Sequence, residues 1–188
     1  VDVGVGDLIS GARRHAGERV GRGGGHGPAG DEPGRQVVVG AGHRAAAGDG
    51  AIGAAERALQ RLCERAVGRI AFGKPLANLG GNRDIIADSR MAIDQARLLT
   101  MKAAWALDKH GTFGALTDIS AIKVVAPNVL QRVVDAAIQI HGGEGVADPE
   151  LSRLMGMARA LRLADGPDEV HRAMVARLEL AKYLPARA

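Results

Sequence analysis

Aromatic residues are scarce in this sequence: Phe, Trp and Tyr together make up 2% of its 188 residues. Its single cysteine, Cys63, excludes a fold held together by internal disulfides. No run of apolar residues approaches the ~18–20 that a membrane-spanning helix needs, and no secretory or transit signal opens the chain. These absences argue against a membrane span and a disulfide-rich secreted miniprotein, and we expect a cytoplasmic protein if the source is bacterial.

The formal net charge of the chain is mildly positive, +4 at pH 7. Residues 1–50 carry six basic and six acidic side chains, and residues 51–188 carry 19 and 15, so the excess lies in the second segment. There the basic and acidic residues alternate at short spacing, which is typical of a solvated and paired helix surface. With so few aromatic side chains to stack on bases, we expect no nucleic-acid partner.

Glycine is unevenly spread, since 15 of the 27 glycines fall within residues 1–50. That segment shows no sustained helical or strand period, which predicts an irregular or disordered region outside the main fold. One stretch, Val37–Ala45, reads as a possible strand followed by G-x-G-x-x-A, the opening of a dinucleotide fold. No second strand follows it, so a chance match in a Gly/Ala-rich tract is the favoured interpretation.

Beyond residue 50 the apolar residues recur every three or four positions, which predicts helices. The expected helices cover residues 51–70, 83–109, 118–142, 149–163 and about 167–183. The loops between them are short, which favours an all-α fold, an antiparallel up-and-down bundle spanning residues 51–185. An irregular Gly-rich segment, residues 1–50, precedes it.

Residues at the ends of the expected helices give the boundaries. Asp118 is a candidate N-cap, and Asp148-Pro149 reads as an N-cap followed by a first-turn proline. Gly166-Pro167 repeats that start signal for the last helix. Pro127 lies within a helix, where it removes one backbone donor and favours a kink.

Few groups in the bundle are reactive. The six histidines show no metal-ligand spacing, so no metal site is expected. Three loop segments are unusual: Arg69–Pro75, Gln139–Gly145 and Leu163–Glu169. Each has a structural interpretation, because basic residues and glycines suit helix C-termini and acidic residues suit helix N-termini. Each also has a functional one, because bare glycine backbone lets a flat or phosphorylated ligand approach closely.

Taken together and in this order, the three segments resemble the signatures of the acyl-CoA dehydrogenases, which are FAD flavoproteins. The resemblance covers residues 51–183 and points to the C-terminal helical domain of that family. The run from Leu163 to His171, with Asp-Gly-Pro-Asp-Glu-Val-His, is most similar to the subfamily of human members 10 and 11. The resemblance also implies a C-terminal fragment, since the family places a helical domain and a β-domain before this one, and residues 1–50 match neither.

The resemblance implies roles by position. The family's catalytic base falls on Asp165, and Gly166 falls beside the substrate thioester. Arg69 and Phe72 match residues that contact the FAD pyrophosphate and adenosine across a dimer interface, and a guanidinium suits phosphate oxygens. The positions matching the family's cofactor-binding residues are Arg69, Phe72, Gln139, Ile140, His141, Gly142, Gly143, Pro167, Asp168 and Glu169.

The implied activity is α,β-dehydrogenation of an acyl-CoA thioester, in which a carboxylate removes the α-proton and FAD accepts a hydride from the β-carbon. The implied assembly is a homodimer or homotetramer, and the implied electron acceptor is an electron-transferring flavoprotein. A second hypothesis is a non-catalytic helical dimerisation or interaction module that binds no flavin.

Overall fold

The structure of the protein, a computed structural model, describes residues 33–185, and side chains from residue 48 onward. A hairpin of two two-residue strands and a 3-10 turn follow the first described helix, and the remaining described elements are helices joined by short turns. The helices are α2 (Pro33–Gly68), α3 (Asn82–Gly114), α4 (Leu116–His141), α5 (Gly143–Ala147), α6 (Pro149–Leu161) and α7 (Asp168–Ala181). The other elements are β1 (Ile70–Ala71), β2 (Lys74–Pro75) and η1 (Leu76–Asn78).

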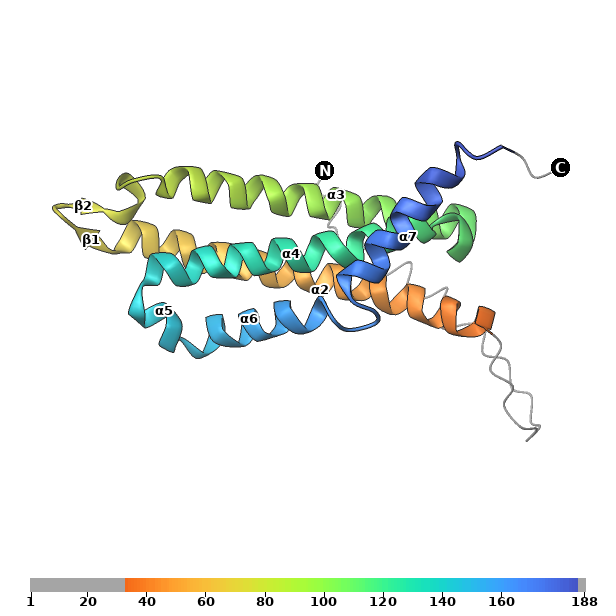
Figure 1. Cartoon of the computed structure of the whole chain (residues 1–188). Coiled ribbons are helices and arrows are strands. Elements are labelled where there is room, and N and C mark those ends of the chain that lie inside the picture. Colours follow the sequence, from red (N-terminus) through yellow and green to blue (C-terminus); the bar gives the residue numbers. More distant parts are fainter. Residues whose placement is uncertain (1–32, 186–188) are drawn as a thin grey trace, which may run out of the picture.

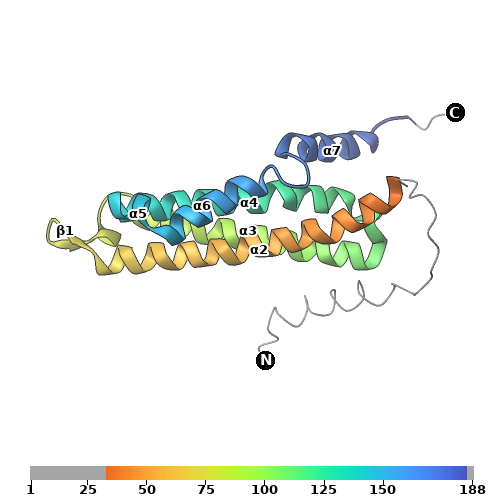
Figure 2. The same ribbon diagram turned by 90° about the horizontal axis from the view of Figure 1, so that it is seen from below.

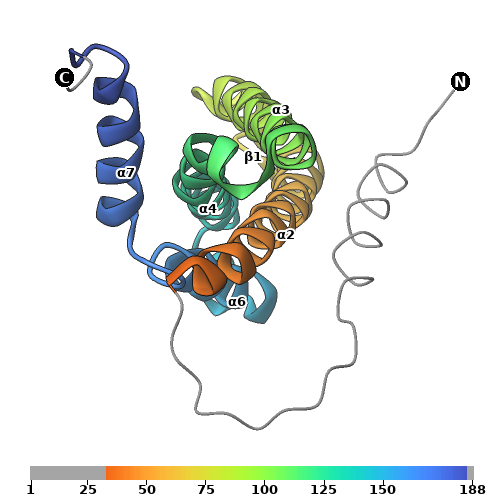
Figure 3. The same ribbon diagram turned by 90° about the vertical axis from the view of Figure 1, so that its right-hand side faces the viewer.

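Helices α2, α3, α4 and α6 run alternately up and down along one axis, which confirms the expected all-α antiparallel bundle (Figure 1). Helix α4 is central, because it contacts α2, α3, α6 and α7. The hairpin and α5 lie at one end of the bundle, and α7 lies toward the other end (Figure 2). Seen along the bundle, α7 stands to one side of α4 (Figure 3). In the side view, α7 runs obliquely across α4 (Figure 1).

Helix α2 starts earlier than expected. Residues 33–50, expected to be irregular, are helical, and so is the Val37–Ala45 run that resembles a dinucleotide motif. Alanines at 45–47 are good helix formers, and extending a helix that is already packed costs less than nucleating one. Gly48 is buried, and a Cβ there would lie 3.5 Å from the Ile122 Cδ1 atom. The remaining part of the expected irregular segment, residues 1–32, lies outside the described residues.

The helix boundaries test the expected caps. The Asp148 side chain caps α6, accepting hydrogen bonds from the backbone of Glu150 at 2.9 Å and of Leu151 at 3.0 Å, as predicted. Helix α7 begins directly after Pro167, also as predicted. Asp118 is not an N-cap: α4 begins two residues earlier, at Leu116, and the Asp118 carboxylate instead accepts a hydrogen bond from Lys102.

The core lies between α2, α3, α4 and α6. The apolar stripe expected on the helix over residues 51–70 is buried as far as Ala66, and its large members Ile52, Leu59 and Leu62 are at most 6% exposed. Ile70, expected to end the stripe, instead lies on β1 and is 55% exposed. Ile93 of α3 and Leu130 of α4 are fully buried. Helix α7 differs, because its only buried residues are polar, Asp168 and His171. Within the described residues, no helix combines the length and the apolar character that crossing a bilayer requires.

Candidate functional site

The predicted site residues fall into two groups, one near the C-terminal end of α4 and one beside its middle. Arg69 and Phe72 lie on the hairpin that follows α2, near the C-terminal end of α4 (Figure 1). Asp165–Pro167 lie in the turn between α6 and α7, while Asp168 and Glu169 begin α7. Asp168 contacts Asn128 in the middle of α4. His141 lies about 20 Å further along α4 than Asn128, at about 1.5 Å of rise per residue. One chain therefore does not bring all the predicted residues into one compact site.

The hairpin holds Phe72 out into solvent. Ala71 pairs with Lys74, so Phe72 and Gly73 form a two-residue turn. Their φ angles are 50° and 75°, both positive, as a type I′ turn requires. Phe72 is 93% exposed, and a bulky residue seldom adopts this conformation. A strained and exposed aromatic residue beside the exposed Arg69 is a feature that fold stability does not require.

The turn after α4 is a second exposed backbone surface. Gly142 has a φ of 68°, and its N–H closes the helix end by donating to the carbonyls of Ile138 and Gln139. Gln139, Gly142 and Gly143 are exposed, while Ile140 and His141 are half-buried. The His141 Nδ1 atom lies 2.7 Å from the Ala137 carbonyl oxygen, which fixes the ring against its own helix.

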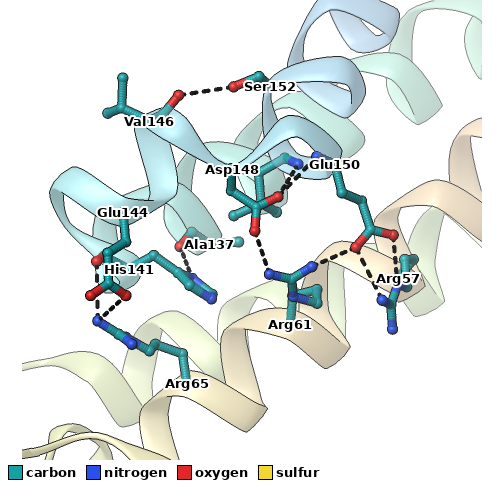
Figure 4. A network of polar contacts seen from close by, with 11 residues as sticks. Arg57, Arg61, Arg65, Ala137, His141, Glu144, Val146, Asp148, Glu150 and Ser152 are labelled. Atoms are coloured by element: carbon teal, nitrogen blue, oxygen red, sulfur yellow. Dashed lines mark hydrogen bonds and ion pairs between the residues drawn. The ribbon is translucent and has the colours of Figure 1, made fainter.

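Three arginines on successive turns of α2 hold this end of the bundle together (Figure 4). Arg57 and Arg61 bind Glu150, and Arg61 also binds Asp148. Hydrogen bonds from the Leu151 backbone and then from Arg61 hold the pKa of Asp148 below its usual range despite partial burial. The α5–α6 segment is thereby fixed to α2.

The third arginine, Arg65, supports the turn after α4 directly. Its Nη2 atom lies 2.9 Å from a Glu144 carboxylate oxygen and 3.4 Å from the His141 carbonyl oxygen (Figure 4). The Glu144 side chain is largely exposed, so water reaches this ion pair. Sequence reasoning did not single out Arg65, although its spacing from Arg57 and Arg61 places all three on one helix face.

The second group is a tight turn with an exposed carboxylate. Asp165 and Gly166 have φ angles of 54° and 104°. The Asp165 side chain is exposed, and none of the described residues donates a hydrogen bond to its carboxylate. Its carbonyl oxygen lies 3.1 Å from His171 Nε2, and the Gly166 carbonyl accepts a hydrogen bond from Lys123 Nζ at 2.9 Å.

Asp168 is the most buried charged residue of the turn, at 2% exposure. One of its oxygens accepts hydrogen bonds from Arg162 at 2.8 Å and Asn128 at 3.0 Å, and its other oxygen has no partner among the described residues. Burial alone raises the pKa of Asp168, but these hydrogen bonds and the nearby arginine charges outweigh it and lower the pKa below its usual value. Glu169 next to it is exposed.

Sequence reasoning missed the residues that support the turn, Lys123, Asn128, Arg162 and His171. Lys123 carried a usable signal, because a lysine within the apolar run Ile122–Val125 is placed on the buried face of a helix. An open hollow of about 210 Å³ lies beside this network, lined by Asn128, Gln131, Arg132, Asp135 and Arg162.

Comparisons with known proteins agree with this architecture. The family model described as "Acyl-CoA dehydrogenase, C-terminal domain" matches residues 41–180, starting ten residues before the expected boundary at residue 51. The chain is 53% identical over 133 residues to the probable acyl-CoA dehydrogenase FadE2 of Mycobacterium tuberculosis, covering 70% of this chain and 33% of that one. It is 50% identical over 140 residues to human acyl-CoA dehydrogenase family member 11, covering 72% of this chain and 18% of that one.

A solved structure gives the same result. The chain superposes on a putative acyl-CoA dehydrogenase from Mycobacterium abscessus with a TM-score of 0.70 and 61% identity, covering 71% of this chain and 33% of that one. The chain thus spans about a third or less of the length of these relatives.

Proposed function

The chain belongs to the acyl-CoA dehydrogenase family, as its C-terminal helical domain, and on that premise we propose that it supplies half of an FAD site and the base for dehydrogenating an acyl-CoA thioester. The observation that carries the proposal is the Asp165–Gly166 turn. It presents a carboxylate to solvent on a backbone whose two carbonyl oxygens are both held by side chains. Such a carboxylate is able to take up a proton without breaking any contact of the fold.

The hairpin residues fit the phosphate and adenosine part of FAD. Arg69 is exposed, and a guanidinium offers paired donors to phosphate oxygens. Phe72 presents a ring face with almost no contact to its own chain, as a stacking partner requires. The exposed backbone of Gly142 and Gly143 allows close approach. FAD, when bound, supplies the acceptor for the hydride that leaves the substrate.

The fit is uneven along the turn between α6 and α7. Asp168 is 2% exposed, and its carboxylate is already bound to Arg162 and Asn128, so it is not available to a ligand in solvent. We therefore assign it to holding the turn, while Pro167 and Glu169 keep their predicted contact with the nucleotide. The separation of the two groups along α4 supports a site completed by a second subunit, and so a homodimer or homotetramer. An electron-transferring flavoprotein is the proposed acceptor of the electrons.

Flavin binding tests the cofactor assignment. The purified chain mixed with FAD should keep flavin absorbance after desalting, and Arg69→Ala should weaken the affinity roughly 10- to 100-fold, as expected for losing a charge-assisted hydrogen bond. Arg159→Ala is the matched control, because it removes an exposed arginine on α6, away from the hairpin. A colourless chain, or equal losses in the two variants, contradicts the assignment.

Asp165→Asn tests the base. In an intact enzyme that contains this domain, it should abolish dehydrogenation and leave FAD affinity and stability unchanged, because the carboxylate makes no hydrogen bond within the described residues. Loss of flavin along with activity would argue instead for a structural role of this side chain, and full activity would end its assignment as the base.

The alternative, a non-catalytic interaction module, has one specific observation in its favour. Met91, Leu98 and Trp105 recur at heptad spacing on α3 and are all exposed. A colourless chain that self-associates, and that loses association in Leu98→Glu, would favour this function over dehydrogenation.

A further inference from the structure

The turn between α6 and α7 has a backbone conformation that must be held from outside. Asp165 has a φ of 54° and Gly166 a φ of 104°. Glycine adopts positive φ freely, but an aspartate does so at a cost and persists there only where the surroundings enforce it.

Two side chains from different helices hold the two carbonyls. His171, in the first turn of α7, lies with Nε2 3.1 Å from the Asp165 carbonyl oxygen. Lys123 of α4 donates from Nζ to the Gly166 carbonyl oxygen at 2.9 Å. Since a carbonyl only accepts, the contact requires that His171 carry its proton on Nε2. Both side chains are buried, at 5% and 3% exposure.

Close packing at Gly166 makes the arrangement specific. A Cβ at this position would lie 3.2 Å from His171 Nε2, so a side chain there would push the imidazole back by a few tenths of an ångström, and the φ of 104° itself favours glycine. A buried ammonium is costly, and an apolar side chain would fill the space of Lys123 at lower cost. The hydrogen bond to the Gly166 carbonyl is one contact that stabilises the ammonium at this buried position.

We propose that Lys123 and His171 are positioning residues, which hold the Asp165–Gly166 turn in its left-handed conformation and thereby fix where the Asp165 carboxylate meets the substrate. The inference rests on the proposed function for the role of Asp165, but the holding of the turn stands on the contacts themselves. Neither side chain is assigned any contact with substrate or cofactor.

The test separates the two claims. Lys123→Met keeps an unbranched side chain and removes the donor. His171→Leu removes the donor on α7, while His171→Gln keeps an N–H at a similar reach and is the matched control. Hydrogen exchange is followed at the amides of Asp168 and Val170, which donate to the carbonyls of Arg162 and Pro167.

We expect exchange at these two amides to become roughly 10- to 100-fold faster in Lys123→Met and His171→Leu, as loss of a hydrogen bond to a charged or buried group implies. Exchange in the core of α2 and α4 should stay unchanged, and His171→Gln should resemble the wild type. In the FAD-loaded protein, the two disruptive variants should lose about 100-fold in kcat with KM and flavin content retained, the effect of a misplacement of about 1 Å.

Unchanged exchange at Asp168 and Val170 in both disruptive variants overturns the proposal, whatever the activity. Faster exchange throughout the bundle also overturns it, because it would show a general structural role. If the turn opens as expected but the wild-type protein neither binds FAD nor oxidises acyl-CoA, the proposed function fails and the holding of the turn stands. If the turn opens and kcat is unaffected, the positioning of Asp165 is refuted.

Discussion

At the hairpin end of the bundle, the groups expected to meet a cofactor are exposed and are supported by ion pairs that water reaches. At the turn between α6 and α7, Asp168, Lys123 and His171 are at most 5% exposed, and Arg162, which binds Asp168, has a side chain 26% exposed. Arg65 binds a largely exposed Glu144, whereas Asp168 binds Arg162 and Asn128 at 2% exposure. Ion pairs in water contribute little, while a buried polar group left without its partner is costly. The two ends should therefore respond very differently to substitution.

The largest effect is expected at Asp168. Asp168→Asn removes the charge that Arg162 binds inside the turn, and the free energy of unfolding should fall by about 2–3 kcal/mol. Denaturant titration followed by circular dichroism measures the change. Glu169→Gln, the exposed neighbour, is the control and should change stability by less than about 0.5 kcal/mol. Similar losses in the two variants would remove the distinction between buried and exposed support.

The Asp168 carboxylate should also make the free energy of unfolding depend on pH in the acidic range. Because hydrogen bonds lower the pKa of Asp168 in the folded state, its contribution to stability is fully present above the ordinary pKa of an aspartate. That contribution is lost as the pH falls through the lower, folded pKa. Unfolding measured at a series of pH values below about 4 should show a shallower loss of stability in Asp168→Asn than in the wild type. Parallel curves would show that the carboxylate binds its proton equally in both states.

A smaller effect is expected in the arginine row of α2. Arg61→Met removes the contacts to Asp148 and Glu150 but leaves the backbone cap that Asp148 forms on α6. The loss should be about 0.5–1 kcal/mol at low ionic strength, and it should shrink in about 1 M salt, where such charges are screened. Asp148→Ala, which removes the cap as well, should retain its loss in salt. A loss of stability in Arg61→Met that does not depend on salt would show that the contacts of Arg61 with Asp148 and Glu150 behave as buried interactions.

The sequence predicted local features well and contacts between distant segments poorly. The α6 start at Asp148-Pro149 and the α7 start after Gly166-Pro167 follow from residues adjacent in the chain, and both are confirmed. The family and its similarity to members 10 and 11 are confirmed as well, because they rest on residues in a fixed order. The early start of α2 at Pro33 was missed, because extending an existing helix costs less than nucleating one, and a glycine-rich composition does not reveal this.

The contacts that support the candidate site could not be predicted from the sequence. Lys123 and Gly166 are 43 residues apart, and their contact depends on α7 crossing α4, which no local pattern encodes. The two-residue strands that carry Phe72 are too short to give a strand period. The assigned roles of Asp165 and of the cofactor-binding residues stay predictions until the variants are measured.

A change in stability as small as that of Arg61→Met, but of opposite sign, is expected at Phe72. This side chain is 93% exposed and has a φ of 50°, so it contributes strain to the hairpin and almost no packing. Phe72→Asn places a residue that tolerates the left-handed conformation there, and the protein should become more stable by about 0.5–1 kcal/mol while FAD affinity falls. Lys74→Asn, in the paired strand of the same hairpin, is the control and should not stabilise. Improved stability with lost flavin binding would mean that the fold tolerates a strained residue at this tip for the sake of the ligand. If stability falls instead, Phe72 is a structural residue. The hairpin and the turn between α6 and α7 would then both contain side chains on which fold stability depends.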